Sequence, residues 1–159
     1  MKVRKVLVTI LLILLIGATL VTAFFYHMSA PVRKERKETI ALAEKYADLE
    51  VPRHFYWYNR DQTYYTITGE NNKNQDIIVT VPQEGNKIRV LNQKDGITRN
   101  EALAIVQKKY HPYDIIKLNF GYYDNTPVWE VTVKNKDNTL SYYTLKFSNG
   151  EMMNTVKNF

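Results

Sequence analysis

The chain has 159 residues, 45% of them hydrophobic and 24% charged, and its 22 basic and 16 acidic residues give a formal charge of +6. It contains no cysteine, which excludes a disulfide framework, thiolate zinc sites, cysteine nucleophiles and a lipidated bacterial N-terminus. The charge is unevenly placed: +3 lies in residues 1–5, +2 in residues 33–38, and only +1 (15 basic against 14 acidic residues) in residues 39–159. The excess charge therefore flanks one apolar segment and does not indicate a nucleic-acid-binding surface.

The apolar segment runs from Val6 to Tyr26 without one charged residue. As a helix, its 21 residues span about 31 Å, which matches a bilayer core of about 30 Å. We therefore predict a cytoplasmic tail over residues 1–5 and an uncleaved transmembrane helix over residues 6–26. The alternative is a cleaved signal peptide, with Val21 and Ala23 or the Ala30 position as the cleavage site. The anchor is favoured because the apolar region of a signal peptide usually has about 7–15 residues.

Basic residues stand on both sides of this span. Three precede it, and four follow it within a basic juxtamembrane segment that we assign to residues 27–37, namely Arg33, Lys34, Arg36 and Lys37. A short tail, one span and a large domain are the usual layout of a signal anchor, which predicts a single-pass protein of the cell membrane with its N-terminus in the cytoplasm and its domains outside. The four basic residues are candidates for contact with anionic headgroups or wall polymers, or they form a solvated start to the next helix.

The first α-β unit is predicted over residues 38–91. Pro31 should interrupt the membrane helix, because proline lacks an N–H and clashes with the preceding turn. Helical spacing of six residues then predicts a second helix that ends before Pro52: Thr39, Ile40, Ala43, Tyr46, Ala47 and Leu49. Runs rich in β-branched and aromatic residues predict four strands, over residues 54–58, 64–68, 77–81 and 87–91.

The second α-β unit is predicted over residues 98–159 with the same order of elements. Thr98 and Glu101 form a capping-box pattern at the start of a helix that Pro112 stops. The buried stripe of this helix is predicted as Ala102, Leu103, Ile105, Val106 and Tyr110. Strands are predicted over residues 115–122, 128–133, 140–147 and 152–156, and Asn149-Gly150 is a hairpin signal between the last two.

The repeated order of elements indicates a duplication. Ala41-Leu42-Ala43 matches Ala102-Leu103-Ala104 at an offset of 61, residues 66–69 match 130–133 at 64, and Gly85 matches Gly150 at 65. The predicted fold class is α+β: a transmembrane helix followed by two tandem units, each with one helix packed on an antiparallel sheet of about four strands. A unit of about 60 residues is marginally stable alone, so the two units should pack on each other.

Several residues of the second unit resemble a known pattern. A helix that ends in tyrosine, a strand with Trp129-Glu130-Val131, a strand from Tyr142 to Phe147 and then Asn149-Gly150 are similar to the PepSY domain. An N-terminal anchor before two such units resembles the TseB-like family of cell-wall elongation regulators from Gram-positive bacteria. The resemblance implies cystatin-like units, an extracytoplasmic location and binding to a class B penicillin-binding protein. It implies no catalytic residues, and the first unit departs from the pattern with Thr66-Ile67-Thr68 in place of Trp-Glu-Val.

Catalytic patterns are scarce in the sequence. The histidines are His27, His54 and His111, and no two of them have the spacing of a zinc protease. We therefore predict no enzyme activity, no cofactor and no metal site. Glu130 is the one carboxylate of interest, because it lies between Trp129 and Val131 in a strand. Strand alternation predicts that Glu130 faces solvent beside a buried tryptophan, or the reverse.

Aromatic residues make up 13% of the chain and run consecutively in the predicted strands, where alternation should turn some of them outward. Exposed aromatic patches mark interaction sites, and the candidates for partner binding are Tyr56, Tyr58, Tyr123 and Tyr142. The alternative is that these rings fill the sheets. The leading hypothesis is a membrane-anchored, non-enzymatic regulator of cell-wall elongation that binds a class B penicillin-binding protein. The alternatives are a PepSY-type protease inhibitor or chaperone-like module, a wall-polymer binding module, and an enzyme acting on a small molecule.

Overall fold

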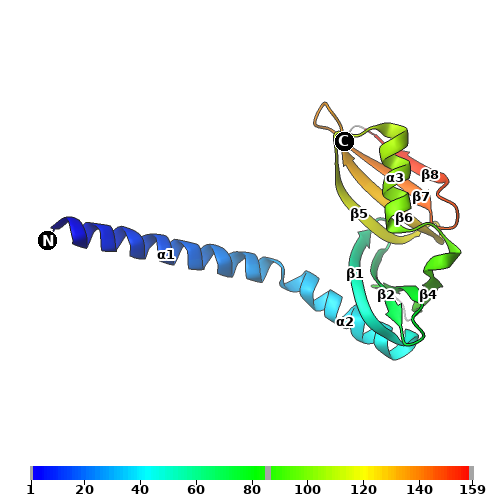
Figure 1. Ribbon diagram of the computed structural model, residues 1–159, viewed down its shortest axis with the longest axis horizontal. Helices are drawn as coiled ribbons and strands as arrows, with labels where there is room; N and C mark the ends of the chain where they lie inside the picture. The colour runs from blue at the N-terminus through cyan, green and yellow to red at the C-terminus, as the bar shows by residue number, and fades with distance from the viewer. Residues whose placement is uncertain (1, 85–86, 158–159) are drawn as a thin grey trace. The chain divides into compact units, whose positions relative to one another are not determined.

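The computed structural model describes residues 2–84 and 87–157 (Figure 1), in two compact units that divide after Lys37. The first unit consists mainly of helix α1, Lys2–Met28, whose apolar side chains are exposed along its length. Residues 6–28 are long and apolar enough to cross a membrane, and none of that stretch is buried in the protein. The predicted helix over residues 6–26 is therefore confirmed, and it fits a single-pass anchor or a signal sequence.

The break after α1 comes just before Pro31, as the sequence predicts. Helix α2, Ala30–Ala47, starts one residue before that proline, so the basic segment is helical and not a separate linker. Arg33 bridges the break: its guanidinium donates to the Tyr26 carbonyl at 2.7 Å and to the Ser29 hydroxyl, and lies 4.0 Å from the centre of the Tyr26 ring. Arg33 thus provides a donor, beside the Ser29 hydroxyl at 3.3 Å, for a carbonyl at the end of α1.

The first half of the second unit is an antiparallel sheet in the order β1-β2-β3-β4, packed on α2. Its strands are β1 Leu49–Asn59, β2 Thr63–Asn71, β3 Asp76–Pro82 and β4 Arg89–Asn92. Thr39 and Ala43 of α2 are buried, and Ala43 packs on a cluster that includes Ile67 and Val79. One residue of the predicted second helix was wrong. Leu49 begins β1, because Asp48 at φ 51° ends the helix, whereas Tyr46 lies in α2 as predicted and is 58% exposed.

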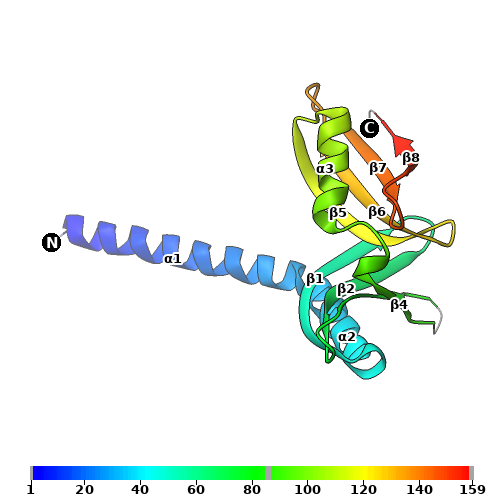
Figure 2. The ribbon, with the colours of Figure 1, turned by 45° about the vertical axis from the view of Figure 1, so that its right-hand side comes forward.

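The second half repeats this plan with sheet order β5-β6-β7-β8. The short helix η1, Gln93–Asp95, leads to α3 Arg99–Tyr110, and the strands are β5 Asp114–Tyr123, β6 Thr126–Lys134, β7 Leu140–Lys146 and β8 Met152–Val156. The capping box is confirmed: Glu101 N–H donates to the Thr98 hydroxyl at 3.2 Å, and Thr98 N–H donates to the Glu101 carboxylate at 2.7 Å. Helix α3 covers one face of this sheet (Figure 2) through buried Ala102 and Val106, so the predicted α+β class is confirmed.

Strand register shows how the two halves correspond. Thr66 pairs with Thr80 between β2 and β3, and Glu130 pairs with Thr144 between β6 and β7, which is an offset of 64 for both partners. The predicted match of residues 66–69 with 130–133 therefore holds. The helix offset of 61 is wrong, because it aligns exposed Ala41 with buried Ala102. The buried pairs align at 63 instead, Thr39 with Ala102 and Ala43 with Val106. The predicted glycine match at position 85 lies outside the described residues.

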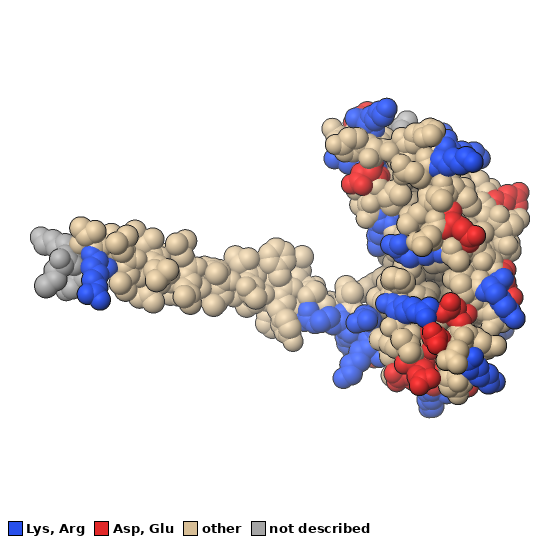
Figure 3. Space-filling model, in the orientation of Figure 1, with Lys and Arg blue, Asp and Glu red and all other residues tan. Residues whose placement is uncertain are grey.

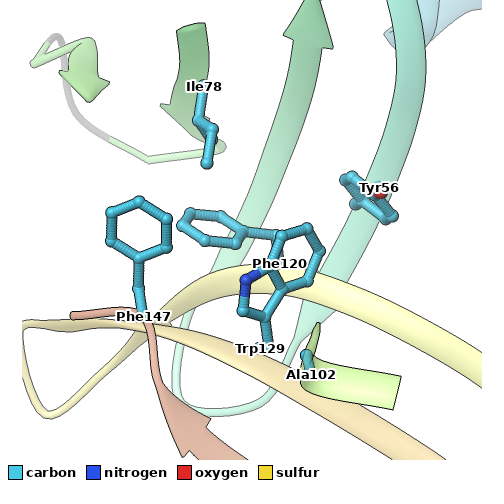
Figure 4. Packing of buried hydrophobic residues seen from close by; sticks show 6 residues of the cluster. All are labelled: Tyr56, Ile78, Ala102, Phe120, Trp129 and Phe147. Atoms are coloured by element: carbon cyan, nitrogen blue, oxygen red, sulfur yellow. The ribbon is translucent and has the colours of Figure 1, made fainter. Parts of the chain in front are cut away.

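One core joins the two halves (Figure 4). Tyr56 and Ile78 come from the first half, and they meet four side chains of the second half, which are Ala102, Phe120, Trp129 and Phe147. The Trp129 ring lies edge-on to two neighbours, with centroids 5.5 Å from Tyr56 and 4.8 Å from Phe120. Hydrogen bonds add to this packing, since the Thr66 hydroxyl donates to the Phe120 carbonyl at 3.1 Å. The prediction that the two units pack on each other is confirmed.

Candidate functional site at the junction of the halves

Strands β1 and β5, which are equivalent in the two halves, meet at this junction. Register gives their offset, because Tyr56 pairs with Thr66 as Asn119 pairs with Glu130, 63 residues on. Tyr58 is therefore equivalent to Gly121, and the two are in contact: a Cβ on Gly121 would lie 2.3 Å from the Tyr58 ring. The two equivalent positions are thus in contact with each other. The space between them holds a large residue from one half and a small residue from the other, but not two tyrosines.

A buried ion pair crosses the junction near this contact. Arg60, in the β1–β2 hairpin, lies 3.5 Å from the Glu130 carboxylate, donates to the Thr144 hydroxyl at 3.1 Å and stacks 4.1 Å from the centre of the Tyr123 ring. Burial raises the pKa of Glu130, and Arg60 and Lys117 oppose that rise. The net rise means that desolvation of the carboxylate outweighs its attraction to the two cations.

The expectation that strand alternation leaves Glu130 or Trp129 in solvent is wrong. Trp129 is fully buried and Glu130 is 9% exposed. Both faces of β6 are covered, because α3 packs on one face and the β1–β2 hairpin of the first half reaches the other. Alternation predicts exposure only for a sheet with one free face.

Tyr56 and Tyr58 do not lie on an outward aromatic face as predicted. They are 6% and 0% exposed, because they fill the junction against Trp129 and Gly121. Each hydroxyl is buried without a hydrogen-bond partner in the described part of the chain. Burial raises the pKa of Tyr58 to about 12, and it also raises the pKa of Tyr56, against the opposing effect of nearby Arg99.

The other two tyrosine candidates are partly exposed. The Tyr123 hydroxyl accepts a hydrogen bond from Asn154 at 3.2 Å, and its ring carries Arg60. Tyr142 pairs with Val156 at the start of the β7–β8 ladder. The structure does not bring these two together with Tyr56 and Tyr58 on one surface, so partner binding by Tyr123 and Tyr142 stays a prediction.

A polar cleft of about 230 Å³ opens at the junction, between β1 and the start of α3. Figure 3 shows a hollow there, with basic side chains on both sides and acidic ones beside it. Arg53 and His54 line it from β1, Arg99 and Asn100 from α3, and buried Tyr56 lies below. Sequence reasoning missed these residues, because Arg53 and Arg99 are 46 positions apart and only the packing of the halves brings them together.

The remaining candidates lie apart from this cleft. Arg33, Lys34, Arg36 and Lys37 are all exposed on α2, and Arg33 holds the helix break. His54 lines the cleft, and His111 caps the end of α3 with φ 47°. Within residues 2–84 and 87–157, no three histidine, aspartate or glutamate side chains gather to hold a metal ion.

Two known domain families match this chain. The family described as "Cell wall elongation regulator TseB-like domain" matches residues 38–82, and "Peptidase propeptide and YPEB domain" (PepSY) matches residues 96–151. The probable cell wall elongation regulator TseB of Bacillus subtilis (strain 168) is 23% identical over 160 residues, covering 98% of this chain and 99% of that protein.

Residues 38–82 therefore match a TseB-like domain, and residues 96–151 match a PepSY domain. The TseB-like match covers α2 from residue 38 through β3, and the PepSY match covers α3 through β7. The fold agrees with a solved structure, the YpmB protein from Bacillus subtilis, with a TM-score of 0.66 and 23% identity over 76% of this chain and 95% of that one. The chain thus carries two different family matches on its two halves.

Proposed function

We propose that this chain regulates cell-wall elongation from the membrane, as a non-enzymatic body that binds a class B penicillin-binding protein. The observation that carries the proposal is the match to a relative named as a probable cell wall elongation regulator, which extends over 98% of this chain and includes the apolar helix. The family descriptions, a regulator domain and a peptidase propeptide domain, name regulatory units and support a role in binding.

Membrane anchoring with the two halves outside is part of this proposal. It is supported by the exposed apolar surface of α1 and by the basic residues that follow it on α2, which suit contact with anionic headgroups. The absence of native cysteine gives a direct test. Ser148→Cys, in an exposed turn, should react with a membrane-impermeant maleimide in intact cells, whereas Val3→Cys should react only after lysis. The opposite pattern would reverse the topology, and loss of the Val3 site from the mature protein would show cleavage.

Binding to a penicillin-binding protein is tested by photo-crosslinking in native membranes. A photoreactive amino acid replaces Tyr142, on the predicted face, or Val90, a control position that is 47% exposed on β4. We expect a class B penicillin-binding protein to be captured from position 142 and not from Val90. A chain with residues 1–37 joined to an unrelated domain controls for capture by the anchor alone. If no penicillin-binding protein exceeds that control from any exposed position, the partner assignment is wrong.

A second candidate function is a protease inhibitor or chaperone-like module. It is favoured by the PepSY match over residues 96–151, because the description of that family names peptidase propeptides. It predicts that the chain slows a secreted or membrane protease without being cut. A panel of such proteases with unchanged rates at saturating chain would exclude it.

A further inference from the structure

Several hydrogen-bonding groups that line the cleft between β1 and α3 already have partners within the protein. Arg53 is already paired, with Glu70 at 2.6 Å and with Asp76. Thr98 and Glu101 satisfy each other through the capping box. The donors left over are on the residues that follow Thr98 on α3, on His54 of β1 and on Tyr56 below them.

Two of these donors are adjacent, the guanidinium of Arg99 and the hydroxyl of Tyr56. Arg99 is exposed and forms no ion pair within residues 2–84 and 87–157. Tyr56 is 6% exposed and lines the cleft, and its hydroxyl oxygen lies beside the Arg99 guanidinium, which only donates, so the hydroxyl proton has no acceptor in the same part of the chain. A buried hydroxyl whose proton has no acceptor is destabilising, so a native protein that keeps one needs a reason.

We infer that this cleft binds a carboxylate of a peptide, held by the Arg99 guanidinium and the Tyr56 hydroxyl. An ionised carboxylate is an acceptor only, and its two oxygens match the planar fork of arginine. Both donors, and the Asn100 side-chain amide beside them, would gain the acceptor that the protein does not provide.

Size and charge select this ligand among anions. The volume of about 230 Å³ is below the roughly 300–1,000 Å³ of drug-sized pockets and admits a carboxylate with a few neighbouring atoms. Asp76 also lines the cleft, and its charge opposes a dianion such as phosphate more than a single carboxylate. The carboxylate can come from a peptide C-terminus or from an aspartate or glutamate side chain. The site does not depend on the proposed function, and it gives the chemistry of one contact with a partner.

The experiment uses the full chain in lipid nanodiscs and three capped dipeptides. Acetyl-Ala-Ala carries only a terminal carboxylate, acetyl-Ala-Glu-amide only a side-chain carboxylate, and acetyl-Ala-Gln-amide carries none. Binding is followed by NMR of the arginine Nε–H signals and of the indole N–H of Trp129, which lines the cleft, with Trp57 as the internal reference outside it.

We expect one or both carboxylate peptides to shift the Arg99 and Trp129 signals, and the amide peptide to shift neither. Arg99→Gln should weaken binding about tenfold or more, and Tyr56→Phe, which keeps the ring packed on Trp129, about threefold. Lys108→Gln removes the same charge from an exposed position on α3 and should leave binding unchanged.

Which carboxylate peptide binds identifies the source of the ligand. The inference is overturned if neither peptide binds, if the amide peptide binds equally well, or if Arg99→Gln and Lys108→Gln weaken binding alike. Tighter binding of inorganic phosphate than of both peptides would overturn the choice of carboxylate. Because these probes contain no penicillin-binding protein, failure here leaves the crosslinking test of the proposed function unaffected.

Discussion

Thr66 and Glu130 occupy equivalent positions in the two halves, and both are buried at the junction. Their side chains differ in charge and in the partners that they bind. Thr66 is neutral, and its hydroxyl donates to the Phe120 carbonyl of the other half and lies 3.0 Å from the Thr80 hydroxyl of its own half. Glu130 is a carboxylate that pairs with Arg60 of the other half. Both side chains therefore have a partner across the junction, but only the second half places a charged group there.

The second half therefore relies on a cation of the first half at this position, whereas the first half relies on a backbone carbonyl of the second half. A similar difference is found at Tyr58 and Gly121, where the tyrosine of the first half fills the space left by the missing side chain of the glycine in the second half. Two identical copies could not form this junction. The comparison predicts that the two halves unfold as one unit, and each variant below tests one part of it.

The largest effect is expected from Gly121→Ala. The added Cβ would lie 2.3–2.8 Å from three atoms of the Tyr58 side chain, which is fully buried. We expect the free energy of unfolding to fall by about 3 kcal/mol, because overpacking of a filled core costs about 1–3 kcal/mol and occasionally more. Urea unfolding measures it. Gly17→Ala, where nothing lies within 4 Å, is the matched control, and equal stability of the two variants would show that the junction is loose.

The next effect is expected from Arg60→Met, which leaves Glu130 buried without its cation. We expect a loss of about 2 kcal/mol, below the usual cost of breaking a buried pair, because Arg60 is 22% exposed and 3.5 Å away. Arg89→Met is the control, since Arg89 stacks 4.1 Å from Tyr122 just as Arg60 stacks on Tyr123. The double variant Arg60→Met with Glu130→Gln should regain most of the loss, and a double variant as unstable as the single one would contradict the role of the pair.

Thr98→Ala tests the local contribution of the second half. It removes the hydroxyl that accepts from Glu101 N–H, and we expect a loss of about 1 kcal/mol in chemical denaturation. Thr98→Ser keeps the hydroxyl and should retain nearly full stability. If both variants lose the same amount, the methyl group and not the cap stabilises the start of α3.

The smallest effect is a pH dependence carried by Glu130. Because burial raises its pKa in the folded state, the folded chain binds this proton more readily, and the stabilisation is complete below the ordinary pKa of 4.5 and lost as pH rises through the folded value. Glu130→Gln should therefore be more stable relative to wild type at pH 7 than near pH 4. A difference that does not change with pH would show that Glu130 titrates normally.

The sequence was sufficient for the elements with strong local signals. The capping box placed the start of α3 at Thr98, and turn residues placed seven of the eight strands within three residues of their observed ends, whereas β1 begins five residues before the predicted start at residue 54. The start of α2 was harder to predict, because the chain continues in helix from Ala30 through charged residues that bury nothing in the protein. Local propensity decides such a helix, and the apolar spacing used for prediction begins only at Thr39.

Sequence reasoning could not reach the junction, because its contacts join residues 46–84 positions apart. Arg60 meets Thr144, and Arg53 shares a cleft with Arg99, only after two sheets pack. The burial of Glu130, Tyr56 and Tyr58 follows from the same packing, which covers a second face of strands that would be half exposed alone. From the tyrosine-rich run alone, an exposed binding face could therefore not be distinguished from a buried junction between the halves.

The most direct test of the single-unit claim uses the two tryptophans, one in each half. With both replaced by 5-fluorotryptophan, Trp57 reports on β1 and Trp129 on β6 as separate ¹⁹F signals in one urea titration of the full chain. We predict that the native signals of both disappear with the same midpoint and slope, because the Arg60–Glu130 pair and the Tyr58–Gly121 contact couple the halves. Loss of the Trp57 signal at a lower urea concentration, with the Trp129 signal still native, would show two independent domains and contradict the account.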